Sequence, residues 1–177
     1  MKKIHMVDLQ TQYKFIKTNV DAGIEQVLNS AQFINGPAVK SFQKNLESYL
    51  GVKNVIPCAN GTDALQIAMM GLGLKPGDEV ITADFTYAST VEVIALLGLT
   101  PVLVDVDPIT FNINPESIEK AITKKTKAIV PVHLFGQVAQ MEKIMQIAKK
   151  HGIFIIEDNA QALGANFTYS NGNKVKA

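Results

Sequence analysis

A mainly parallel α/β sheet with helices on both faces is the fold that this 177-residue sequence predicts. Short apolar runs rich in β-branched residues recur from position 55 onward, which is typical of strands buried on both faces. Stretches with helical spacing separate these runs, and such alternation favours parallel strand pairing. Hydrophobic residues make up 47% of the chain and charged residues 19%, a balance typical of globular rather than disordered proteins.

Two amphipathic helices are expected before the first strand. Apolar residues between 11 and 29 recur at spacings of three and four, which places them in one stripe of a helix. An Asn-Gly-Pro sequence at 35–37 then interrupts the chain, and the helical spacing resumes over 39–50. We therefore divide the chain into an N-terminal helical segment, 1–50, and the first part of an α/β domain, 51–177.

The α/β part alternates expected strands with expected helices. The strand runs are 55–58, 79–82, 101–105, 128–132 and 153–156. Helices are expected at 62–73, 87–97, 115–123 and 139–150, the third with Asn114 as its N-cap and Pro115 at its first position. Ligands of such sheets bind beyond the carboxyl ends of the strands, so the loops there are the candidate site.

Composition restricts the class of partner. Seventeen basic and sixteen acidic residues leave a net charge of +1, without the basic excess of nucleic-acid-binding proteins. Every basic residue is a lysine, so an anion site has to use backbone N–H groups, hydroxyls or lysines. The single Cys58 permits no intramolecular disulfide, and no apolar stretch approaches the ~18 residues of a membrane span. We expect a cytoplasmic protein that binds a small molecule, with no nucleic acid, membrane or metal partner.

The loop after the first strand run offers a candidate phosphate site. Gly61 allows the backbone to approach a ligand closely, and the N–H groups of a helix start, together with the Thr62 hydroxyl, bind phosphate well. Taken alone, the segment is better explained as an ordinary helix start capped by Asn60. Neither GxxxxGK[ST] nor GxGxxG is present, which leaves nucleotide-cofactor binding as only a third alternative.

Three other loops contain residues that suit a ligand site. Tyr87 follows the run at 79–82 and could stack on a planar ring, whereas Phe85 is better explained by core packing. His133 fits a hydrogen-bonded structural histidine better than an acid or base, because no Ser or Cys nucleophile accompanies it. Asp158 follows the last apolar run, where a carboxylate pairs with a cationic ligand group or caps a turn. Together the loops offer a phosphate cradle, a stacking ring and an acid, which pyridoxal phosphate (PLP) needs besides a lysine.

The motifs NGTDAL, PGDEVI, FTYAST, PVLVDVDP, KTKAIVPVHLFGQ and IIEDNAQALGA, in this order, resemble the DegT/DnrJ/EryC1/StrS family of PLP-dependent sugar aminotransferases. The resemblance runs from Val7 to about Ala165. It implies the large domain of a fold-type I aminotransferase, without the last strands and the small C-terminal domain. The stretch 58–67 looks closest to members that aminate UDP-3-keto-N-acetylglucosaminuronate for surface polysaccharides, and other members serve antibiotic sugar biosynthesis.

The resemblance also implies roles for individual residues. Gly61 and Thr62 would hold the cofactor phosphate, and Tyr87 would stack on the pyridine ring. Asp158 would pair with the protonated ring nitrogen, and Gln161 would hydrogen-bond the 3-oxygen of the ring. The implied activity is transfer of an amino group, from glutamate, to a keto group of a nucleotide-linked sugar. The full-length protein is expected to be a homodimer.

The resemblance also predicts what the sequence lacks. The Schiff-base lysine of the family lies downstream of the ED motif, and the sequence stops at Ala177 before the segment that bears it; Lys174 and Lys176 come too early to replace it. We therefore expect the chain alone to be inactive. The alternatives are a fragment that acts only in binding or assembly, and a sugar dehydratase of the same family, which uses His in place of the lysine. The run at 55–58 pairs with a late strand in the family and would have an exposed edge here.

Overall fold

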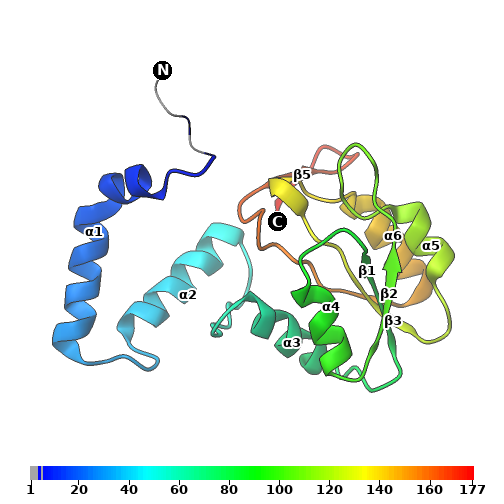
Figure 1. The fold of residues 1–177 in the computed structure, drawn as a ribbon, viewed down its shortest axis with the longest axis horizontal. Coiled ribbons are helices and arrows are strands. Elements are labelled where there is room, and N and C mark those ends of the chain that lie inside the picture. The colour runs from blue at the N-terminus through cyan, green and yellow to red at the C-terminus, as the bar shows by residue number, and fades with distance from the viewer. Residues whose placement is uncertain (1–3, 5) are drawn as a thin grey trace. The chain divides into compact units, whose positions relative to one another are not determined.

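The structure of the chain, a computed structural model, describes residue 4 and residues 6–177 (Figure 1). Two compact units are present, Met1–Pro57 and Cys58–Ala177. A compact unit is not by itself an independently folding domain, so the division into 1–50 and 51–177 stays a prediction. Within the part of the chain that is described, none of the helices is long and apolar enough to cross a membrane.

The first unit contains two helices whose starts are set by local sequence. Helix α1, Leu9–Ser30, follows Asp8, and a carboxylate oxygen of Asp8 accepts a hydrogen bond from the Thr11 N–H at 3.0 Å. Helix α2, Pro37–Leu50, has proline at its first position and ends at Gly51 with a φ of 71°. Both helices confirm the prediction made from the apolar spacing, but neither contains a buried residue.

The strand predicted at 55–58 is wrong. These residues have no regular secondary structure. The backbone N–H of Val55 donates to a carboxylate oxygen of Glu47 at 3.0 Å, and its carbonyl accepts from the Gln43 side chain at 2.8 Å. Side chains of α2 therefore satisfy the backbone groups of Val55, the first residue of the run, which a neighbouring strand would otherwise have bonded.

A four-stranded parallel sheet lies at the centre of the second unit, with strand order β2-β1-β3-β4. The strands are β1, Glu79–Ala83; β2, Thr100–Val104; β3, Thr126–Val130; and β4, Phe154–Ile155. The sheet confirms the predicted fold class and the four strand runs from 79 onward. The last strand is shorter than the apolar run that predicted it.

Helices cover both faces of the sheet. Those on one face are α3, Gly61–Gly71, and α4, Ser89–Leu96; those on the other are α5, Pro115–Ala121, and α6, Met141–His151. Successive residues of β1 alternate between the faces: Val80 packs in the cluster with Met69 of α3, and Ile81 packs in the cluster with Ile144 of α6. All four of these side chains are fully buried.

A small antiparallel hairpin near the C-terminus was not predicted. It consists of β5, Asn166–Thr168, and β6, Lys174–Lys176. The Tyr169 hydroxyl lies 3.2 Å from the sulfur of Met145 on α6, and the Ser170 N–H donates to the Glu142 carboxylate of the same helix at 3.0 Å. These contacts attach the hairpin to α6.

Candidate functional site

A pocket of about 240 Å³ lies beyond the carboxyl ends of β1 and β3, beside the start of α3. The pocket is lined by Gly61, Thr62, Leu65, Tyr87, Ser89, Val132, Leu134, Asp158, Ala160 and Gln161. All five site residues expected from the sequence are in this set. A larger cavity of about 590 Å³ lies within the first unit, but none of its lining side chains is an acid, a base or a thiol.

One end of the pocket is the N-terminus of α3. The Asn60 side chain accepts a hydrogen bond from the Asp63 N–H at 2.9 Å, which confirms Asn60 as the N-cap. The N–H groups of Gly61 and Thr62, in the first turn, have no acceptor within their own helix. A Cβ atom built on Gly61 would meet no protein atom within 4 Å, so the space in front of the glycine is open. This end therefore combines backbone donors, a hydroxyl and the positive helix terminus, which suit an anion.

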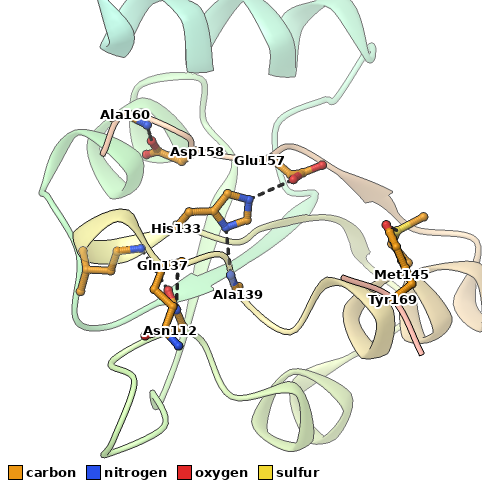
Figure 2. Close-up of polar contacts among 10 residues, drawn as sticks. Asn112, His133, Gln137, Ala139, Met145, Glu157, Asp158, Ala160 and Tyr169 are labelled. Carbon is orange, nitrogen blue, oxygen red and sulfur yellow. Dashed lines mark hydrogen bonds and ion pairs between the residues drawn. The ribbon is translucent and has the colours of Figure 1, made fainter. Parts of the chain in front are cut away.

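The carboxylate of Asp158 is held in one orientation. The Thr90 hydroxyl donates to one carboxylate oxygen at 3.1 Å. The Ala160 N–H donates to the other oxygen at 3.2 Å, as Figure 2 shows. The backbone of Asp158 is bonded on both sides, since its N–H donates to the Pro131 carbonyl and its carbonyl accepts from the His133 N–H. The acid is thus attached to the chain that follows β3 and oriented by its neighbours.

Tyr87 and Gln161 line the pocket in different ways. Tyr87 is 75% exposed, so its ring is accessible to a ligand. The Gln161 side-chain oxygen accepts a hydrogen bond from the Phe135 N–H at 2.7 Å, which leaves its amide N–H groups as donors. Phe85 does not line the pocket, and its ring lies against Phe111 with centroids 5.5 Å apart. The expectation that Phe85 packs in the core is wrong, because the side chains around it are themselves at the surface and leave it 49% exposed.

His133 is a buried, fully hydrogen-bonded histidine. Its Nδ1 accepts a hydrogen bond from the Ala139 N–H at 3.2 Å, and its Nε2 lies 2.9 Å from a carboxylate oxygen of Glu157 (Figure 2). Because Nδ1 acts as the acceptor, the ring proton is on Nε2 and is donated to Glu157. With both nitrogens engaged and no exposed surface, the ring fits the structural interpretation rather than that of an acid or base.

The site also includes residues that the sequence did not single out. The most informative residue is Thr90, which does not itself line the pocket: its hydroxyl contacts the predicted site residue Asp158 from 68 positions away in the sequence. No local pattern reports such a contact; the one available signal was the position of Thr90 at a helix start beyond a strand end. None of the side chains that line the pocket is a lysine. Lys174 and Lys176 belong to strand β6.

Comparisons with known proteins show which family the chain resembles. The family model that matches describes the DegT/DnrJ/EryC1/StrS aminotransferase family and covers residues 14–175. A UDP-2-acetamido-2-deoxy-3-oxo-D-glucuronate aminotransferase from Pseudomonas aeruginosa is 52% identical over 93% of this chain and 46% of its own length. A crystal structure of a family member from Brucella abortus superposes with a TM-score of 0.88 and 46% identity, covering 92% of this chain and 45% of that one.

A second solved structure contains a bound cofactor. The protein NtdA from Bacillus subtilis, solved with pyridoxamine phosphate (PMP), has a TM-score of 0.88 and 36% identity over 93% of this chain and 38% of its own. The chain thus spans less than half the length of the relatives it matches. Because the family model covers residues 14–175 and a relative with 52% identity matches nearly all of the sequence, this chain belongs to the DegT/DnrJ/EryC1/StrS aminotransferase family.

Proposed function

We propose that this chain forms the cofactor-binding part of an enzyme that uses PLP to transfer an amino group to a keto group of a nucleotide-linked sugar. The observation that carries the proposal is the pocket itself. Its lining includes both the N-terminal residues of α3 and Asp158, whose carboxylate is oriented by two hydrogen bonds. An anion site and a fixed carboxylate are what a phosphorylated pyridinium requires.

The chemistry of the lining residues fits PLP. The Gly61 and Thr62 end would hold the phosphate, because the N–H groups there are donors and the added bulk of a side chain is missing at Gly61. Tyr87 would stack on the pyridine ring, and the amide N–H of Gln161 would donate to the 3-oxygen. When bound, PLP supplies an electron sink that makes the carbon next to the transferred nitrogen acidic.

Each residue of the chain then has a defined task. Asp158, as an anion, would hold a proton on the ring nitrogen, which maintains the electron-withdrawing form of the ring. The apolar side chains of Leu65, Val132 and Leu134 form part of the lining and would exclude water from the face of the ring. His133 would not exchange protons with the substrate, because both of its ring nitrogens already have protein partners.

The identity of the substrates is the finer part of the proposal. We propose UDP-3-keto-N-acetylglucosaminuronate as the amino acceptor, glutamate as the donor and surface-polysaccharide synthesis as the pathway. The name of the 52%-identical Pseudomonas relative supports this acceptor. We place the reaction in the cytoplasm, where nucleotide-linked sugars and glutamate would both be available.

We also propose that the full-length protein is a homodimer. Phe85, Phe111 and Phe135 support this, because their rings contact one another while each remains between 42% and 71% exposed. Contiguous exposed aromatic rings are typical of interfaces. Sedimentation of the full-length protein would give a dimer mass, and Phe135→Ser would shift it toward the monomer. A monomer in the unmodified protein would contradict this part of the proposal.

A non-catalytic role in binding or assembly is the second candidate function. The lack of a lysine among the pocket residues favours it for the 177-residue chain taken alone. A dehydratase of the same family is the third possibility that the test must separate.

The test uses the full-length protein loaded with PMP and mixed with the keto sugar. Amination predicts that PMP is converted to PLP, followed by absorbance, and that mass spectrometry finds the aminated sugar. ¹⁵N-glutamate should then transfer its label to the sugar over many turnovers. A dehydrated sugar without added nitrogen would identify the dehydratase, and an unchanged sugar in the presence of bound PMP would favour the binding role.

A further inference from the structure

A fully buried hydroxyl that contacts a residue of the pocket lining has no part in the proposed mechanism. Thr90 has no exposed surface, although its residue neighbours Tyr87 and Asp158 both line the pocket. Its side-chain oxygen lies 3.1 Å from a carboxylate oxygen of Asp158. A hydroxyl in this position donates its proton to the carboxylate, since an ionised carboxylate only accepts hydrogen bonds.

The second oxygen of the same carboxylate is also occupied. The Ala160 N–H donates to it at 3.2 Å, so one hydrogen bond reaches each oxygen of Asp158. The χ2 torsion of aspartate has a broad distribution, so a carboxylate that accepts a hydrogen bond from only one donor can rotate about the Cβ–Cγ bond. Two donors that come from different segments, helix α4 and the loop after Asp158, define the plane of the group. A carboxylate has about four lone-pair positions, so two remain for a ligand.

Thr90 also connects the acid to the proposed stacking residue. The backbone N–H of Thr90 donates to the carbonyl of Tyr87 at 3.3 Å, in the turn that starts α4. The side chain and the backbone of one buried residue thus contact both Asp158 and Tyr87. A shift of Thr90 would change the position of the acid relative to the ring it is proposed to serve.

We propose that Thr90 is a positioning residue: its hydroxyl holds the Asp158 carboxylate so that a free lone pair faces the ring nitrogen of PLP. This inference rests on the proposed function, because it requires PLP in the pocket. Thr90 itself does not touch the cofactor, and it acts only through Asp158. Its loss should therefore reduce protonation of the ring nitrogen while the phosphate contacts at the start of α3 remain.

The test replaces the hydroxyl with a methyl group in the full-length protein loaded with PLP that carries ¹⁵N in its ring. We expect Thr90→Val to move the ring-nitrogen chemical shift from the pyridinium toward the neutral pyridine position. Its kcat should fall by roughly tenfold, since small errors in the position of a catalytic group are costly, while KM for the sugar stays within a few-fold. Thr90→Ser keeps the hydroxyl and should retain the parent chemical shift.

Thr82 provides a matched control. It is also a fully buried threonine, and its hydroxyl donates to the Val130 carbonyl at 3.0 Å; this acceptor is a main-chain group of a residue outside the pocket lining, whereas the acceptor of Thr90 is the Asp158 carboxylate. Thr82→Val removes the same chemical group and should lower stability without moving the ring-nitrogen shift. If Thr90→Val does not fold, Thr90→Ala takes its place, because it adds no atom to a buried position.

The outcomes separate the two claims. Unmodified protein that does not bind PLP would overturn the proposed function and this inference with it. Bound PLP with the same ring-nitrogen shift in Thr90→Val, or Thr90→Ala where that replaces it, and in the parent would overturn the inference alone. A Thr90→Ser variant that loses as much protonation as the hydroxyl-free variant would show that the methyl group, and not the hydroxyl, is what matters, and this would also overturn it.

Discussion

Asp158 is the residue whose chemistry the mechanism depends on most. In the full-length protein, Asp158→Asn keeps the size of the side chain but removes the charge that holds a proton on the ring nitrogen. We expect kcat to fall by on the order of 100-fold, as for the loss of one preorganised electrostatic contact. PLP affinity should change only a few-fold, because the contacts at Gly61 and Thr62 remain. Steady-state kinetics will measure kcat, and a PLP titration will measure the cofactor affinity. Equal losses in kcat and in PLP affinity would remove Asp158 from this role.

Tyr87 tests whether the ring of the cofactor is stacked. Tyr87→Phe keeps a flat ring and should retain most PLP affinity, whereas Tyr87→Ala should lose about 1 kcal/mol, a roughly fivefold weaker binding. Phe85→Ala is the control, because Phe85 packs on Phe111 and lies outside the pocket lining. Weaker binding in Phe85→Ala, with Tyr87→Ala unchanged and equally folded, would show that the stacking residue is wrongly assigned.

The site residues that could be predicted from the sequence are those that lie close in sequence to a strand end. Gly61, Tyr87 and Asp158 each follow an apolar run or precede a helical one, so topology alone brings them to one edge of the sheet. The contact of Thr90 could not be predicted, because its partner Asp158 lies 68 positions away in the sequence. The exposure of Phe85 could not be predicted either, because the sequence does not show whether neighbouring side chains cover an aromatic ring.

At the scale of elements, the start of α3 links stability to ligand binding. Asn60→Ala removes the cap of this helix and should lower the free energy of unfolding by about 1 kcal/mol. It should also weaken PLP binding, because the first turn of α3 would be less ordered. Asn114→Ala removes the equivalent cap of α5, which lies outside the pocket lining, and should lower stability alike without a change in binding. Urea unfolding and PLP titration of both variants will show this, and equal PLP affinities would contradict it.

The attachment of the β5–β6 hairpin to α6 should depend on pH. Hydrogen bonds from the Ser170 hydroxyl and N–H lower the pKa of the Glu142 carboxyl below its usual value. Because the pKa of Glu142 is lower in the folded than in the unfolded state, the contact stabilises the hairpin fully at pH values above the unfolded-state pKa. This stabilisation is lost as the pH falls through the folded-state pKa. The protection factors of the hairpin amides, which compare the observed exchange rate with the intrinsic rate at each pH, should therefore fall on acidification.

Two variants check the origin of that effect. Glu142→Gln should lower the protection factors of the hairpin amides already at neutral pH and remove most of the pH dependence of these factors. Glu25→Gln, an exposed position on α1, should leave the hairpin unchanged. An unchanged pH dependence in Glu142→Gln would show that other groups govern the attachment.

Elements were predictable where burial imposes a pattern on the sequence. The four parallel strands and helices α3 to α6 have the apolar spacing that core packing requires, whereas α1 and α2 have the same spacing without a buried residue. The ends of these elements, as the described residues give them, agree with expectation to within a few residues. Residues 55–58 have the composition of a strand, but they pair with none of the described strands, and α2 side chains bond the backbone of Val55 instead. The hairpin was not predicted, because its strands are short and lie largely at the surface, where the alternation of apolar and polar residues is weak.

At the scale of the whole molecule, the 177-residue chain should bind PLP weakly and without a covalent bond. Its pocket offers phosphate, ring and pyridinium contacts, but no lysine lies among the lining residues. We expect dialysable PLP and no attachment to protein after borohydride reduction. A reduced adduct at Lys174 or Lys176, found by peptide mass spectrometry, would contradict this expectation and show that the hairpin can reach the pocket.

The central claim is that Gly61, Thr62, Tyr87, Asp158 and Gln161 form one PLP site. A crystal structure of the full-length protein with PMP bound tests it most directly. We predict the phosphate within hydrogen-bond distance, about 3 Å, of the Gly61 and Thr62 N–H groups, and the ring nitrogen equally close to an Asp158 oxygen. The Tyr87 ring should lie flat on the pyridine, with Gln161 at the 3-oxygen. PMP bound elsewhere, or in this pocket with Asp158 turned away from the ring nitrogen, would contradict the account.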